Sequence, residues 1–184
     1  MNARFGGIAL MIVLCAHATL GAQPSQTTTP PAAPSRADVI AAAIDIMQQA
    51  RFSTLVTIGR DKQPQSRIVE PFAPDSDLVI WIGTNSVTRK VDEIRHNKRV
   101  TLTYFRPATF EYVTVLGTAV IDTDPAHKAA HWNVGWASLY KDQFRGDDYV
   151  LLKVVPARIE VISQQRGMRN DPKTWLPVTL DLRK

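Results

Sequence analysis

The chain has 184 residues, a formal net charge of +5 and one cysteine. A single cysteine excludes an internal disulfide framework and a cysteine-based metal site. The small excess of basic side chains suits an anionic ligand and does not require nucleic acid as a partner.

The first 22 residues have the composition of a secretory signal peptide. Arg4 gives a weakly positive start, and residues 8–15 form an apolar core that is too short to span a bilayer. Small residues at 16–18, or Ala22, offer a cleavage site. We therefore expect an exported protein, periplasmic or secreted, with no stable membrane insertion after cleavage.

Residues 23–35 are rich in Pro, Thr and Ala and carry no charge, which predicts a flexible linker. Residues 36–184 then form one domain of ordinary size. Its first element is a predicted helix that ends near Ala50, because Ser35 and Asp38 have capping-box spacing and apolar residues follow at helical spacing.

Two strands are expected next, at residues 53–58 and 65–72, with a turn between them. The second strand carries Arg67, and an arginine in a strand is more often a surface residue than a ligand. An apolar run at residues 78–82 predicts a buried strand, which polar residues at 83–86 then interrupt.

A short helix is expected after this interruption, with Thr88 as its N-cap and Asn97 at its end. The order strand, loop, helix N-terminus is typical of an anion site, because the first amides of a helix have no internal partner. Arg89 and Lys90 lie in the first turn, where the helix dipole disfavours cations. A bound phosphate explains this pair, and the alternative is a basic turn that is only solvated.

Two more strands are expected at residues 100–105 and 112–123, with a bend or bulge at Gly117. Residues 149–162 are expected to form either a pair of strands or a single strand bent around Pro156. Short strands at close spacing, with too few helices for regular βαβ units, predict a mainly β protein with flanking helices. The pattern alone fits either an antiparallel barrel or an open sheet.

A further helix is expected from Asp124, and Trp132, Trp136 and Tyr140 recur every four residues within it. We interpret this aromatic face as core or dimer-interface packing, and the alternative is a wall beside a flat cofactor. The two histidines of this segment also lie four residues apart, but there is no third ligand, so we expect no metal site.

The residues around the predicted anion site match a known pattern in type and spacing. The matching segments are residues 64–69, 84–85, 88–90, 97–100 and 112–120. In these segments the chain resembles the flavin-binding core of the pyridoxamine 5′-phosphate oxidase-like split barrels, including the general stress protein branch. The resemblance covers roughly residues 37–163 and implies an antiparallel split β-barrel.

The resemblance implies FMN as the cofactor and a homodimer with the flavin at its interface. Arg67, Arg89 and Lys90 would pair with the phosphate, and the hydroxyl groups of Thr84 and Thr88 would donate hydrogen bonds to it. The remaining residues implied to be cofactor-binding are Ile68, Val69, Trp81 and Ile82, which would lie along the ring or the ribityl chain, and Tyr112.

Departures from the family leave the substrate open. Phe72 stands where true pyridoxamine 5′-phosphate oxidases have a lysine, and Tyr112 stands where they have a glutamine. The tail from Gln164 lacks their substrate-binding Arg-Leu-His-Asp-Arg run, so we do not expect oxidation of pyridoxamine 5′-phosphate. Local spacing suggests no nucleophile–base pair and no paired carboxylates, so the catalytic residues are unknown.

Three functions remain open. The first is an FMN-dependent oxidoreductase of unknown substrate, in which the flavin carries the redox chemistry. The second is a non-catalytic binder of flavin, haem or deazaflavin in the same barrel. The third is a structural dimer with an empty site, because a protein that is exported unfolded must meet its flavin outside the cytoplasm.

Overall fold

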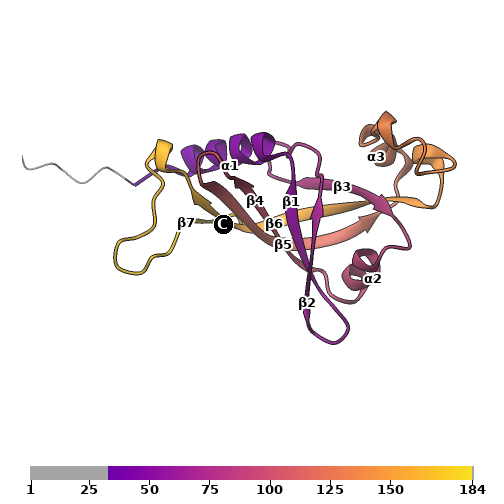
Figure 1. Ribbon diagram of the computed structural model, residues 1–184, viewed down its shortest axis with the longest axis horizontal. Helices are drawn as coiled ribbons and strands as arrows, with labels where there is room; N and C mark the ends of the chain where they lie inside the picture. The colour runs from indigo at the N-terminus through magenta and orange to yellow at the C-terminus, as the bar shows by residue number, and fades with distance from the viewer. Residues whose placement is uncertain (1–32, 184) are drawn as a thin grey trace, which may run out of the picture. The chain divides into compact units, whose positions relative to one another are not determined.

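Seven strands form one antiparallel sheet in the computed structural model, which describes residues 33–183 (Figure 1). The order along the sheet is β2-β1-β4-β5-β6-β3, and β7 pairs with β6. The strands are β1 Ser53–Ile58, β2 Pro64–Val69, β3 Ile80–Asn85, β4 Arg99–Arg106, β5 Glu111–Asp122, β6 Tyr149–Ile162 and β7 Val178–Asp181. The predicted signal peptide, residues 1–22, and residues 23–32 of the predicted linker lie outside the described residues.

Short helices flank this sheet. They are α1 Arg36–Ala50, α2 Arg89–His96 and α3 Pro125–Ala130, with the 3-10 turns η1 Val134–Trp136, η2 Gln143–Arg145 and η3 Gln164–Arg166. In the view of Figure 1, α1 lies above the strands, and α2 lies below β5 and β6 and beside β2. The expectation of a mainly β, antiparallel fold with flanking helices is therefore confirmed. Between residues 33 and 183, no helix is both long enough and apolar enough to cross a membrane.

The first helix begins and ends as its sequence predicts. The Ser35 hydroxyl accepts a hydrogen bond from the Asp38 amide (3.2 Å), and the Asp38 carboxylate accepts one from the Ser35 amide (3.1 Å). This capping box satisfies two amides that the helix itself leaves unpaired. The helix packs on β4, β5 and β6 with its buried residues Val39, Ala42, Ala43, Ile46 and Met47.

Two strands, β2 and β3, differ from the prediction at their ends by more than one residue. β2 ends at Val69, earlier than expected, because Pro71 has no amide for the ladder. β3 begins at Ile80, since Leu78 has a positive φ of 61° and closes a turn with Asp75 (3.0 Å). β3 also continues through the polar residues at 83–85, which pair with β6, so the predicted interruption begins later than expected.

The long helix predicted after Asp124 is wrong, because α3 ends at Ala130. The Asn133 side chain accepts a hydrogen bond from the Gly135 amide (2.9 Å), and this local bond favours a 3-10 turn over a continued helix. The predicted aromatic packing is confirmed nevertheless. Trp132 and Tyr140 meet the buried ring of Tyr149 edge to face, with centroids 5.1 and 5.0 Å apart.

The bulge predicted at Gly117 is confirmed, because the register between β5 and β6 shifts between Leu116 and Gly117. A Cβ at Gly117 would lie 2.3 Å from the carbonyl oxygen of Val155, so only glycine fits against the neighbouring strand. Of the two alternatives for residues 149–162, the single strand is the one found, as β6, and its residues contribute to both sides of the sheet, where two apolar clusters form.

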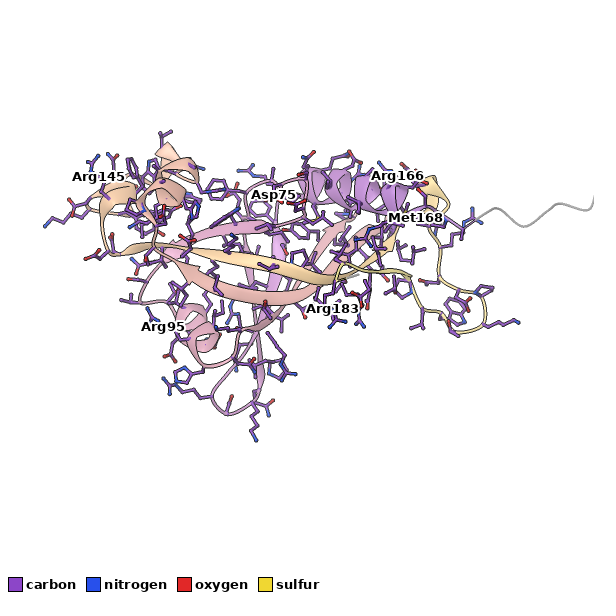
Figure 2. All side chains as sticks on the ribbon, turned by 180° about the vertical axis from the view of Figure 1, so that it is seen from behind. Asp75, Arg95, Arg145, Arg166, Met168 and Arg183 are labelled. Atoms are coloured by element: carbon purple, nitrogen blue, oxygen red, sulfur yellow. The ribbon has the colours of Figure 1, made fainter. Side chains whose placement is uncertain are left out.

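A buried carboxylate at the start of β5 forms hydrogen bonds with the segment that follows β6. Glu111 is fully buried and accepts hydrogen bonds from Arg106 (2.5 Å), Ser163 (2.5 Å) and Arg166 (3.0 Å). Arg166, which lies beside α1 in Figure 2, also pairs with Asp45 of that helix. Burial raises the pKa of the Glu111 carboxyl, but these hydrogen bonds and the arginine charges outweigh burial and hold the pKa below its ordinary value.

Candidate functional site

The loop between β3 and α2 leaves the first turn of α2 open to an anion. Thr88 is the N-cap, as predicted, but its hydroxyl donates to the carbonyl oxygen of Asn85 (2.8 Å) and does not cap the helix. The hydroxyl of Thr84 lies 3.4 Å from that of Thr88. The Val91 amide donates to the Thr88 carbonyl oxygen (2.9 Å), but no side chain caps the amides of Arg89 and Lys90, so these two are available to a ligand.

A buried carboxylate lies behind this turn. Glu93 of α2 accepts hydrogen bonds on one oxygen from Arg67 (2.7 Å) and from the hydroxyl of Thr57 (2.5 Å). Its other oxygen lies 3.1 Å from the Arg89 guanidinium. The Arg67 guanidinium is held further by Thr57 (2.5 Å) and by the carbonyl oxygen of Gln65 (3.0 Å). Two predicted phosphate ligands therefore share one acid.

Lys90 has a different environment from its neighbour Arg89. Its ammonium group is half-buried and forms no hydrogen bond or ion pair with any other residue of 33–183. Burial lowers the pKa of Lys90, the charge of Arg67 lowers it further, and Glu93 acts in the opposite direction. A cation that is half removed from water and has no direct acid partner is a candidate ligand for an anion.

Lys90 lines a pocket of about 260 Å³ beside β2, β3 and the aromatic segment after α3. Its polar lining residues are Thr84, Lys90 and Glu70, and the Glu70 carboxylate already pairs with Arg51 at 2.8 Å. The rest of the wall is formed by glycine, aliphatic and aromatic residues, which are Ile68, Val69, Ile82, Gly83, Trp136, Leu139 and Tyr140. One cation at the edge of an apolar wall can hold an amphipathic, anionic molecule.

Five of the ten predicted cofactor-binding residues line this pocket together, namely Ile68, Val69, Ile82, Thr84 and Lys90. Thr88 lies beside Thr84 in the adjoining loop. Arg67 does not line this pocket and pairs with Glu93, which together with Arg89 lines a second, more polar pocket of about 290 Å³. The structure thus separates Arg89 from Lys90, which the sequence treats as one pair.

Trp81 and Tyr112 do not line the pocket of their own chain. The Trp81 ring stacks on His131, with centroids 4.6 Å apart, and the Lys153 ammonium lies 5.1 Å from its centroid. Tyr112 lies near the start of β5, where it pairs across the sheet with Phe105 and Ile162.

Sequence reasoning missed one residue of the site, Glu93, and weighed two others, Trp136 and Tyr140, only as an alternative. Glu93 stands four residues after Arg89, which is the spacing of a helical ion pair, and that signal was available in the sequence. Trp136 and Tyr140 were weighed as a wall beside a flat cofactor, and both line the pocket while Tyr140 also packs in the aromatic cluster. The packing interpretation is therefore confirmed, and the cofactor-wall interpretation stays a prediction.

The sequence matches the family model described as pyridoxamine 5′-phosphate oxidase like over residues 38–168. The chain belongs to this family. Comparison with curated proteins finds no significant match.

Solved structures of the family share the fold of this chain. General stress protein 26 from Bacillus anthracis str. Sterne has 24% identity and a TM-score of 0.63, and the match covers 78% of this chain and 98% of that one. A Clostridium acetobutylicum protein related to general stress protein 26 has 18% identity and a TM-score of 0.64, with 78% and 94% covered. These similarities confirm the predicted split-barrel fold of the pyridoxamine 5′-phosphate oxidase-like family.

Proposed function

We propose that this member of the pyridoxamine 5′-phosphate oxidase-like family is an FMN-binding flavoprotein and an oxidoreductase of unknown substrate. The observation that carries the proposal is Lys90, a half-buried cation without an acid partner among residues 33–183 that borders an apolar pocket. A phosphate at this position would be attracted to the ammonium group and to the uncapped first turn of α2.

The proposed phosphate site uses two kinds of donor. Lys90 acts as a point charge, and the hydroxyl of Thr84 would donate to a ligand oxygen, whereas the hydroxyl of Thr88 would do so only by leaving the carbonyl oxygen of Asn85. Arg67 and Arg89 add positive potential nearby, which their shared partner Glu93 offsets only in part. Three cations and one acid leave this region positively charged, which suits a phosphate monoester.

The proposed ring site is the apolar wall of the same pocket. Ile68 and Leu139 both line it, and their side chains are 67% and 69% exposed. A flat isoalloxazine ring would cover such side chains and remove apolar surface from water. The apolar wall therefore suits a flavin ring. Haem is disfavoured, because it needs an axial ligand and no histidine, cysteine or methionine is among the residues that line this pocket.

We further propose that the site is completed in a homodimer. The pocket of about 260 Å³ is smaller than the usual volume of a pocket for a ligand of this size, so one chain covers only part of the cofactor. Tyr112 does not line the pocket of its own chain, and in an isologous dimer it would contribute to the partner's site. A partner chain would also cover the apolar side chains of Ile68 and Leu139, which line the pocket and are exposed in the single chain.

The chemistry of the proposed reaction belongs to the cofactor, because a bound FMN supplies hydride and electron transfer at its ring. The residues of the chain bind and orient it: Lys90 and the α2 amides fix the phosphate, and Trp136 and Leu139 exclude water from the ring side. A non-catalytic flavin or deazaflavin binder is the alternative function, since the same pocket residues would serve it.

The proposal is tested by the visible absorption spectrum of the full chain after gel filtration in the presence of FMN. We expect flavin absorption to elute with the protein at the volume of a dimer. Elution of all FMN in the small-molecule fraction would contradict the proposal. Bleaching of the bound flavin by NADH or NADPH under anaerobic conditions then supports an oxidoreductase, whereas a flavin that neither nucleotide reduces supports the non-catalytic alternative.

We also propose export, on the basis of the N-terminal sequence alone. Mass spectrometry of the protein isolated from its native host tests this proposal. Loss of about the first 18 to 22 residues is the expected result, and an intact N-terminus contradicts it.

A further inference from the structure

Glu93 is a carboxylate in a position where an apolar residue is the usual choice. It is 3% exposed and lies on the inner face of α2 with the buried residues Val91 and Ile94. A buried carboxylate is costly unless donors satisfy it, so its presence requires a reason beyond helix packing.

The contacts of Glu93 come from three different elements. Thr57 of β1 and Arg67 of β2 donate to one carboxylate oxygen at 2.5 and 2.7 Å, and Arg89 of α2 lies 3.1 Å from the other. The neighbouring acid of α2, Asp92, faces outward and pairs with Arg60 at 2.9 and 3.1 Å. Glu93 therefore engages Arg67 and Arg89 and offsets one of their two positive charges, whereas Lys90 faces its pocket without a direct acid partner among residues 33–183.

From this arrangement we propose that Glu93 determines the specificity of the phosphate site, by occupying Arg67 and Arg89 so that free inorganic anions do not fill it. The inference rests on the proposed function. A small anion would meet one available cation, Lys90, and would have to displace a carboxylate to reach the arginines. An FMN molecule also gains contact with the apolar wall around Ile68, and this contact compensates for the weaker phosphate attraction.

Two further observations agree with this assignment. Burial and the charge of Arg67 lower the pKa of Lys90, so a second uncompensated cation beside it would be unfavourable without a bound anion. The Arg67 guanidinium is also fixed by Thr57 and Gln65, so it cannot turn away from Glu93 without losing further hydrogen bonds. The Glu93 carboxylate thus takes the place that an anionic ligand would otherwise occupy next to Arg67 and Arg89.

The test is the competition of inorganic phosphate with FMN in full-length protein, for wild type, Glu93→Gln and Asp92→Asn. The two variants remove the same charge from adjacent residues of α2, but only Glu93 contacts the site arginines. We expect Glu93→Gln to lower the phosphate concentration for half-displacement of FMN by at least about tenfold, and Asp92→Asn to change it by less than about threefold. Unchanged or weaker phosphate competition in Glu93→Gln overturns the inference.

Circular dichroism and thermal melting establish whether Glu93→Gln is folded. If it is not, the double variant Arg67→Met, Glu93→Leu replaces the buried pair by apolar groups of similar volume, a change that proteins often tolerate. Arg89 is then free of its carboxylate, so phosphate competition stronger than in wild type is again expected, and its absence overturns the inference. FMN binding to wild type with no change in the variants defeats this inference alone, whereas no FMN binding to wild type overturns it together with the proposed function.

Discussion

Replacement of Lys90 by methionine separates the binding role of this residue from a structural one. The substitution keeps a flexible side chain of similar length and removes the charge. Lys90 forms no hydrogen bond or ion pair with other residues of 33–183, so its removal breaks no direct polar contact within that part of the protein. Any loss of FMN affinity then arises from the lost contact with the ligand.

The size of the effect follows from the type of contact. A hydrogen bond to a charged group contributes about 1.5 to 3 kcal/mol. With RT of about 0.59 kcal/mol at 25 °C, this range corresponds to an increase in the Kd for FMN of about 10- to 160-fold. The melting temperature of the ligand-free variant should stay unchanged or rise, because the lowered pKa of Lys90 indicates that its charged form is disfavoured in the folded protein.

The assay is quenching of FMN fluorescence on titration with protein. Arg95→Met is the matched control, since Arg95 is an exposed cation on the same helix (Figure 2) and does not line the pocket. We expect its Kd to change by less than about threefold, because exposed charges interact weakly with distant ligands in salt. An FMN affinity of Lys90→Met equal to that of wild type would refute the assignment of the phosphate site.

Two predictions concern the scaffold. Gly117→Ala should destabilise the fold by about 1 to 3 kcal/mol in a denaturant titration, because its Cβ would lie 2.3 Å from the Val155 carbonyl oxygen, and an unchanged midpoint would contradict the bulge. Glu111 has a folded-state pKa below its ordinary value of 4.5, so its stabilising effect is present above that pH and is lost as the pH falls through the lower folded-state value. Glu111→Gln should therefore be less stable than wild type at pH 7, and the difference should shrink below about pH 4.5; a difference that is constant with pH would contradict this account.

Local sequence signals predicted those elements whose ends are set by local bonds. The capping box of Ser35 and Asp38 fixed the start of α1, and the β-branched run of β6 fixed its bounds. The signals failed where tertiary contacts decide. Gly83 and its polar neighbours continue β3 because β6 pairs with them and the ring of Trp136 covers Gly83, whose Cβ would lie 2.5 Å from that ring.

The sequence predicted several residues of the candidate site, but it did not predict the ion pairs between them. Spacing and family resemblance brought Thr84, Thr88 and Lys90 into one hypothesis, and the structure places them around one loop and pocket. The position of Arg67 on a buried acid could not be predicted, because it depends on how β2 and α2 pack across Thr57. The sequence also suggested that Arg89 and Lys90 act together because they are adjacent. In a helix, however, neighbouring side chains point in different directions, and these two line different pockets.

The most direct test of the central claim is a comparison of FMN and riboflavin binding to the full chain at low phosphate concentration. The two ligands share the isoalloxazine ring and the ribityl chain and differ in the phosphate alone. The account predicts saturable FMN binding at one molecule per chain, with riboflavin at least about tenfold weaker, because Lys90 and the first turn of α2 would contact the phosphate in the proposed site. Equal affinity for both ligands, or no saturable binding of FMN, would contradict it.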